Sequence, residues 1–132
     1  MRFVDANVFI YVLVKSPRVA YETSKQILQR VENGEETLTN TAVIQEVVDW
    51  LEYNNRKREV KIFITAVNSF LAMNKVGAAW DDVLVAIDDV EKYDIDFVDA
   101  LTLQTMRKNN VKEIYSNDTD FDRVEWIKRV WE

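Results

Sequence analysis

The stretch Arg2-Phe3-Val4-Asp5 starts the chain with a short apolar strand that ends in a carboxylate. Residues 7–14, which follow it, are apolar nearly throughout and predict a helix packed beneath the edge of a sheet. A strand predicted over residues 112–116 is likewise followed by an acidic residue, Asp118. Strands that alternate with helices predict an α/β fold, in which a short parallel sheet is covered by helices on both faces.

The spacing of apolar residues predicts further helices over residues 19–33, 41–54, 60–71, 80–90 and 96–108. Gly34 is a natural stop for the first of these helices, and Thr41 can cap the second. Short strands are predicted over residues 37–40 and 124–127. Residues 83–87 also fit a buried strand, but the wider apolar pattern around them favours a helix.

The chain of 132 residues has the length of one ordinary domain, so we expect a single domain over residues 1–132. It contains no Cys and no His, which excludes disulfides, zinc-thiolate sites and imidazole catalysis. Proton chemistry therefore falls to carboxylates, Lys, Tyr or bound water. No apolar stretch approaches the roughly 20 residues that a membrane crossing needs, and the N-terminus lacks a signal core. We expect a cytoplasmic protein without a membrane partner.

The formal net charge of −6 is distributed unevenly. Residues 76–100 hold eight acidic residues against Lys92 alone, which gives −7 there and +1 for the remainder. Such an acidic chain is a poor candidate for tight, unspecific nucleic-acid binding. A small basic rim is still compatible with it, and Arg56, Lys57 and Arg58, with Lys61 nearby, are the candidates. The plain alternative for this group is a solvated helix end.

Four acidic residues lie where a strand should end or a helix begin: Asp5, Glu46, Asp99 and Asp118. In an open parallel sheet such positions meet at the carboxyl ends of the strands, so we expect these side chains to converge. A cluster of carboxylates requires a cation to offset its repulsion. The plain alternatives are an N-cap or turn role for Asp5 and stabilisation of a helix dipole by Asp99.

The acidic run Asp118, Asp120 and Asp122 also invites comparison with a calcium-binding EF-hand loop. Such a loop needs Gly at its sixth position and Glu at its twelfth, and here Arg123 and Arg129 occupy them. The run is therefore not an EF-hand.

Four short motifs occur in a particular order along the chain: Val4-Asp5-Ala6-Asn7-Val8-Phe9, Ile44-Gln45-Glu46-Val47, Phe97-Val98-Asp99-Ala100-Leu101 and Ser116-Asn117-Asp118-Thr119-Asp120-Phe121. In this order and spacing the chain resembles the PIN-domain nucleases, and among them the VapC toxins of toxin-antitoxin pairs. The resemblance covers essentially the whole chain and implies a three-layer α/β/α fold. One departure is expected, because the helical stretch 80–90 replaces the strand that the family commonly places between its two central helical regions.

The resemblance implies a ribonuclease that depends on Mg²⁺ or Mn²⁺. It implies that Asp5, Glu46, Asp99 and Asp118 are the catalytic and metal-binding residues, and that Asp120 holds a second ion or tunes the first. Asn7 and Ser116 are plausible hydrogen-bonding supports for this set. The implied partners are an RNA substrate, a second copy of the chain in a homodimer, and a small antitoxin. Several large aromatic residues are candidates for interfaces: Trp50, Tyr53, Trp80, Trp126 and Trp131.

Three other classes of protein remain to be weighed. A phosphate-accepting receiver domain needs paired acids after its first strand, whereas Asp5-Ala6 supplies one. A haloacid-dehalogenase-like phosphatase needs a second Asp where Asn7 stands. The remaining alternative is a non-catalytic protein-interaction module with an acidic pocket.

Overall fold

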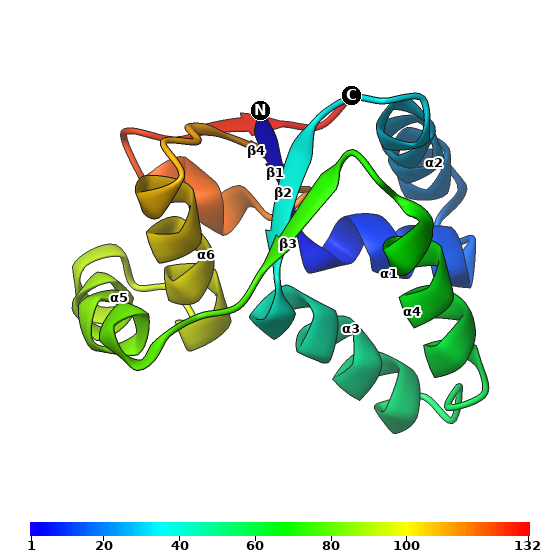
Figure 1. The fold of residues 1–132 in the computed structure, drawn as a ribbon, viewed down its shortest axis with the longest axis horizontal. Helices are drawn as coiled ribbons and strands as arrows, with labels where there is room; N and C mark the ends of the chain where they lie inside the picture. Colours follow the sequence, from blue (N-terminus) through cyan, green and yellow to red (C-terminus); the bar gives the residue numbers. More distant parts are fainter.

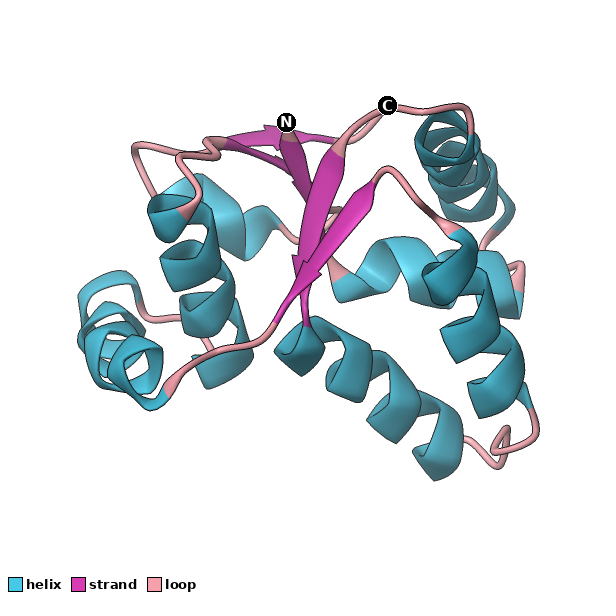
Figure 2. Ribbon diagram, viewed as in Figure 1, coloured by secondary structure: helices cyan, strands magenta, loops and turns pink.

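All strands of the sheet run parallel, in the order β3-β2-β1-β4-β5 (Figures 1 and 2). In the computed structural model, which describes all 132 residues, their bounds are Arg2–Val4 for β1, Thr37–Asn40 for β2, Met73–Val76 for β3, Glu113–Tyr115 for β4 and Lys128–Val130 for β5. The chain builds outward from β1 first toward β3 and later toward β5. The strand order therefore reverses between β1 and β4, where open parallel sheets bind their ligands.

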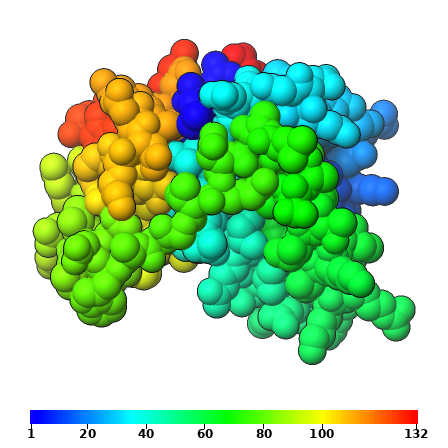
Figure 3. Space-filling view, in the orientation of Figure 1, coloured from blue at the N-terminus to red at the C-terminus, as the bar shows by residue number.

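Helices cover both faces of the sheet, which confirms the three-layer α/β/α architecture. On one face lie α1 (Ala6–Val14), α2 (Arg18–Glu32), α3 (Thr41–Tyr53) and α4 (Glu59–Ser69) (Figure 1). On the other face lie α5 (Trp80–Tyr93) and α6 (Phe97–Lys108), and a short 3-10 helix, η1 (Thr119–Arg123), follows β4. In the space-filling view the lobe of α5 and α6 and the lobe of α3 and α4 are separated by a recess (Figure 3).

The core is built from strands that are buried on both faces. Phe3 and Val4 of β1 and Ile114 and Tyr115 of β4 are fully buried, because helices cover the sheet on each side. The helices contribute buried apolar stripes to the same core, for example Val43, Val47 and Leu51 of α3. None of the helices combines the length and apolar character that a membrane crossing requires.

Two predictions about edge strands were wrong. The third edge strand that residues 80–90 were expected to replace is present as β3, directly after α4, which ends at Ser69. The last strand is β5 at Lys128–Val130 and not residues 124–127, where the Ile127 N–H bonds to the Val124 carbonyl in a turn. Both are edge strands with largely exposed side chains, so neither shows the apolar run of a central strand.

The helical assignment of residues 80–90 is confirmed, since α5 spans Trp80–Tyr93. Its first turn is fixed by Asp82, whose carboxylate accepts a hydrogen bond of 2.8 Å from the Ala79 N–H. The predicted cap of α3 was displaced by one residue. Asn40, and not Thr41, accepts the hydrogen bond from the Val43 N–H, at 2.8 Å.

Candidate metal centre

The four acidic residues singled out by the sequence line one hollow of about 250 Å³. Asp5 follows β1, Asp118 follows β4, Glu46 lies in the second turn of α3 and Asp99 in the first turn of α6. The hollow therefore opens at the point where the strand order reverses. Its wall is completed by residues close to these four: Ala6, Asn7, Ile10, Trp50 and Asp96.

Asp5 is held by its neighbours on β1 and β4. The register pairs Val4 with Tyr115, so the ends of the two strands lie side by side. One carboxylate oxygen of Asp5 accepts a hydrogen bond of 2.8 Å from the Ala6 N–H and caps α1. The other accepts one of 2.6 Å from the Ser116 hydroxyl. The plain N-cap role and a place in the carboxylate cluster therefore coexist in one side chain.

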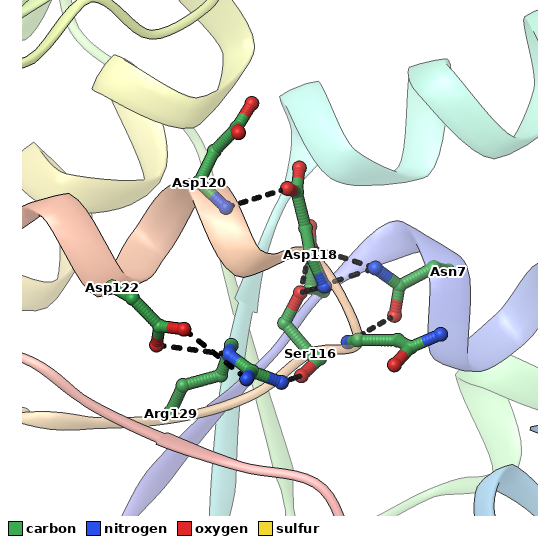
Figure 4. A network of polar contacts seen from close by, with 8 residues as sticks. Asn7, Ser116, Asp118, Asp120, Asp122 and Arg129 are labelled. Atoms are coloured by element: carbon green, nitrogen blue, oxygen red, sulfur yellow. Dashed lines mark hydrogen bonds and ion pairs between the residues drawn. The ribbon is translucent and has the colours of Figure 1, made fainter.

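A network of short polar contacts joins the start of α1 to the segment after β4 (Figure 4). The Asn7 amide donates to Ser116 Oγ at 3.1 Å and to Asp5 Oδ2 at 3.3 Å. The same Ser116 oxygen accepts from the Asp118 N–H at 3.0 Å. Asn7 and Ser116 thus bond to the carboxylate of Asp5, and Ser116 also bonds to the backbone N–H of Asp118, so they join two segments from opposite ends of the sequence.

Three carboxyl groups in the hollow, those of Asp5, Glu46 and Asp99, have raised pKa values. Burial raises the pKa of Asp5 to about 6, against the hydrogen bonds from Ser116 and Ala6, which lower it. Burial and then the charges of Asp5 and Asp118 raise the pKa of Asp99 to about 8. Loss of surrounding water and then the charge of Asp5 raise the pKa of Glu46 to about 7, although Glu46 lies at an exposed rim. Ionisation of all three groups together at neutral pH therefore needs a cation.

The donor set fits a hard divalent cation, because carboxylate oxygens and one amide oxygen are all that the wall offers. No three carboxylates stand close enough together to ligate one ion directly. An ion held here would keep water molecules between itself and part of the set, as Mg²⁺ commonly does. The chain has no Cys and no His, so it offers no thiolate or imidazole ligands to metals that prefer them.

Two residues of this wall were not expected as part of the site. Asp96 occupies the N-cap position of α6, makes no capping hydrogen bond and lines the hollow. Asp96 lies three residues before Asp99, which places both on one helical face. This spacing is the sequence feature from which Asp96 could have been predicted. Trp50 lies four residues after Glu46 on α3 and supplies an aromatic wall.

Two groups of candidate residues lie outside the hollow. Asp120 does not line it, and its carboxylate is paired with Arg123 at 3.2 Å. Arg56 is tied to the protein, because its guanidinium donates to the Leu13 carbonyl at 2.9 Å and pairs with Glu59. Lys57 and Arg58 are exposed. The acidic segment 76–100 reaches the strand ends, because Asp96 and Asp99 belong to it and line the hollow.

Comparison with known proteins places this geometry in a family. The family model of the PIN domain matches residues 2–127. VapC20 of Mycobacterium tuberculosis, described as a sarcin-ricin loop cleaving toxin, is similar in structure, with a TM-score of 0.78, 20% identity, and coverage of 92% of this chain and 93% of that one. No curated protein matched the chain.

Two further solved structures share the fold. A toxin-antitoxin complex from Klebsiella pneumoniae gives a TM-score of 0.67 at 16% identity, over 97% of this chain and 96% of that one. VapBC2 from Rickettsia felis, bound to a DNA fragment of its promoter, gives a TM-score of 0.73 at 13% identity, over 99% of this chain and 98% of that one. The sheet, the helices on both faces and the order of the acidic motifs thus agree with the family match, and this chain belongs to the PIN domain family.

Proposed function

We propose that this protein is a VapC-like endoribonuclease that hydrolyses RNA phosphodiester bonds with a carboxylate-bound Mg²⁺ or Mn²⁺. The observation that carries the proposal is the hollow itself. Five carboxylates line it at the reversal of the strand order, those of Asp5, Glu46, Asp96, Asp99 and Asp118, and no Lys or Arg side chain lines it with them. Structural acidic residues are normally paired, so an unpaired set in a hollow favours a functional site.

Each residue has a defined role in this proposal. Asp5, Asp99 and Asp118 bind the ion directly or through water, and Glu46 completes the set or orients a water molecule. When bound, the ion polarises the phosphoryl oxygen, lowers the pKa of the attacking water and stabilises the leaving oxygen. Asn7 and Ser116 hold Asp5 and the segment of Asp118 in place through the contacts described above. Asp120 serves a second ion only if its pair with Arg123 opens.

RNA is the proposed substrate on two grounds. One structural relative is described as cleaving the sarcin-ricin loop, which is RNA. The chain also offers exposed basic residues after α3, the helix that carries Glu46, and these are Lys57, Arg58 and Lys61. Arg56 remains a candidate for RNA binding, but its contacts with Leu13 and Glu59 also give it a structural role.

Two protein partners complete the proposal. Two structural relatives are described as a toxin-antitoxin complex and as VapBC2, so we propose that a small antitoxin covers this site. We also propose a homodimer, because large aromatic side chains remain uncovered, notably Tyr53 at 89% exposure and Trp80 at 73%. Light scattering at micromolar concentration tests the dimer, and a strictly monomeric mass counts against it.

The test of the catalytic proposal compares the parent with Asp5→Asn and Asp99→Asn. Both variants should keep the fold and lose Mn²⁺-dependent cleavage of RNA. Asp88→Asn, an exposed acidic position of α5, is the matched control and should cleave like the parent. If the parent leaves RNA intact with Mn²⁺ or Mg²⁺ present, the hollow belongs to a non-catalytic interaction module and the proposal fails.

A further inference from the structure

A second hollow, of about 340 Å³, adjoins the carboxylate hollow. It lies between α3 and α6, and its lining residues are Ala42, Gln45, Glu46, Asp49, Phe97, Val98 and Leu101. The four α3 residues recur at spacings of three and four, so they form one stripe of that helix that faces α6. Glu46 lines both hollows, which makes its side chain their common wall.

The chemistry of this groove differs from that of its neighbour. Its apolar lining residues include Ala42, Val98 and Leu101, and Phe97 at the start of α6 is 41% exposed. Two exposed polar side chains, Gln45 and Asp49, stand on the α3 side. A flat aromatic ring beside an amide and a carboxylate matches a nucleobase, which has a stacking face and a polar edge.

The acidic residues around the groove indicate which kind of ligand can bind in it. The carboxylates of Glu46 and Asp49 on the wall of the groove disfavour an acidic partner, such as a second copy of this chain with its net charge of −6. A neutral base avoids this cost, because the charged phosphate next to it stays at the carboxylate hollow, where the cation is proposed. A base that enters a groove of this kind must be unpaired, because a paired base is stacked within its duplex.

We propose that the groove between α3 and α6 binds the nucleobase next to the scissile phosphate of single-stranded RNA, stacked on Phe97. This proposal rests on the proposed function, since it assigns a substrate contact to the same site. Phe97 then determines how the strand is positioned over the carboxylates. It contributes to substrate binding and takes no part in holding the ion.

The experiment measures cleavage of a short single-stranded RNA in Mn²⁺ by the parent and by Phe97→Ala. Each is given the normal RNA and one with an abasic nucleotide next to the cut. Phe97→Ala should lower kcat/KM by about 5- to 150-fold, mainly through KM, which is the range for loss of one stacked base. The abasic RNA should impair the parent to a similar extent and impair Phe97→Ala little further.

Three controls separate stacking from other effects. Phe97→Trp should restore kcat/KM and Phe97→Leu should not, because only the former keeps an aromatic ring. Mn²⁺ affinity, measured by calorimetry, should be unchanged in all three Phe97 variants. Leu71→Ala, at a side chain that is 93% exposed in the loop before β3, should behave like the parent.

Two results would overturn the inference while cleavage by the parent stands. The first is an abasic RNA that impairs the parent and Phe97→Ala by the same factor. The second is a Phe97→Ala variant that changes the oligomeric mass and leaves RNA kinetics untouched, which would make the groove a protein interface. A parent that does not cleave RNA at all would instead refute the proposed function, and this inference with it.

Discussion

Buried carboxylates occur in two regions of this molecule, and the two regions treat them in opposite ways. At the contact between α5 and α6, Asp82 is paired with Lys108 and Asp89 with Arg107, each at 3.1 Å. In the hollow at the strand ends, Asp99 has no such cation, although its exposure of 8% is close to the 7% of Asp82 and the 6% of Asp89. Similar solvent exposure thus accompanies two different charge environments.

The pKa values follow this difference. The Ala79 N–H, with Lys108 and Gln104, lowers the pKa of Asp82 below its ordinary value. Burial and neighbouring like charges raise the pKa of Asp99 to about 8. A buried acid is therefore not by itself a sign of function in this protein. The proposed site is marked instead by buried acids whose charge the protein leaves uncompensated.

The largest expected difference between the two regions is catalytic. Asp99→Asn should lower Mn²⁺-dependent RNA cleavage by on the order of 10²-fold or more, because the proposed role of Asp99 is to hold the ion that stabilises the reacting charge. Asp89→Asn, equally buried but paired with Arg107, should change the rate little once its fold is intact. Initial cleavage rates of the two variants, measured at equal concentrations of folded protein, test this prediction. Equal losses of activity would show that the two regions do not differ in function.

The second prediction concerns pH and the bound ion. The folded-state pKa values of Asp5, Glu46 and Asp99 are raised to about 6, 7 and 8, from ordinary values of 3.8, 4.5 and 3.8. A raised folded-state pKa gives stability that is present below the unfolded pKa and is lost as pH rises through the folded one. The metal-free protein should therefore lose stability between about pH 4 and pH 8.

A divalent ion should reverse this loss. At an ion concentration of 100 times its Kd the gain is about 2.7 kcal/mol, and the gain should be greatest near pH 8. Thermal unfolding with EDTA or Mn²⁺ across this range measures it. A metal-free Tm that rises steadily from pH 4 to pH 8 would contradict the uncompensated hollow.

The third prediction uses stability without any ion. Asp99→Asn should stabilise the metal-free protein at pH 8 by about 1 kcal/mol, because it removes a like charge from the hollow. Asp82→Asn should destabilise it by about 1 kcal/mol or more, because Lys108 and the Ala79 N–H lose their charged acceptor. Urea unfolding compares the two, and effects of the same sign would show that the regions do not differ.

The smallest expected effect is at the basic residues that follow α3. Replacing Lys57 and Arg58 with Ala should weaken RNA binding and reduce the log-log salt slope by about 0.7 for each lost single-strand phosphate contact. Mn²⁺ affinity should not change. Arg56→Ala should also lower the free energy of unfolding, since Arg56 bonds to the Leu13 carbonyl. An unchanged slope and unchanged cleavage would identify the cluster as a solvated helix end.

The sequence predicts the central part of this fold better than its edges. The strands β1 and β4 are fully buried at their centres, so their apolar runs and the acids after them were visible in the chain. The strands β3 and β5 lie at the edges, where side chains face solvent and the apolar pattern is lost. Their existence depends on pairing with β2 and β4, which no local pattern encodes.

The same limit applies to the candidate site. Asp5, Glu46, Asp99 and Asp118 were predicted because each stands at the end of a strand or near the start of a helix. Asp96 and Trp50 were not, because their place in the wall depends on how α6 and α3 are oriented around the sheet. Asp120 belongs to the same motif as Asp118, yet its side chain turns to Arg123 within η1. Spacing along the chain predicts which residues lie near the site, but it does not predict the direction in which their side chains point.

The central claim is that the hollow is an uncompensated carboxylate set that takes up a divalent cation. Calorimetric titration with Mn²⁺ at pH 7.5, in buffers of different ionisation enthalpy, tests it most directly. We expect the parent and Asp88→Asn to bind Mn²⁺ with release of protons, because raised-pKa carboxyl groups must ionise to bind it, and Asp5→Asn to bind far more weakly. A parent that shows no Mn²⁺ binding, or an Asp5→Asn variant that binds like the parent, would contradict the account.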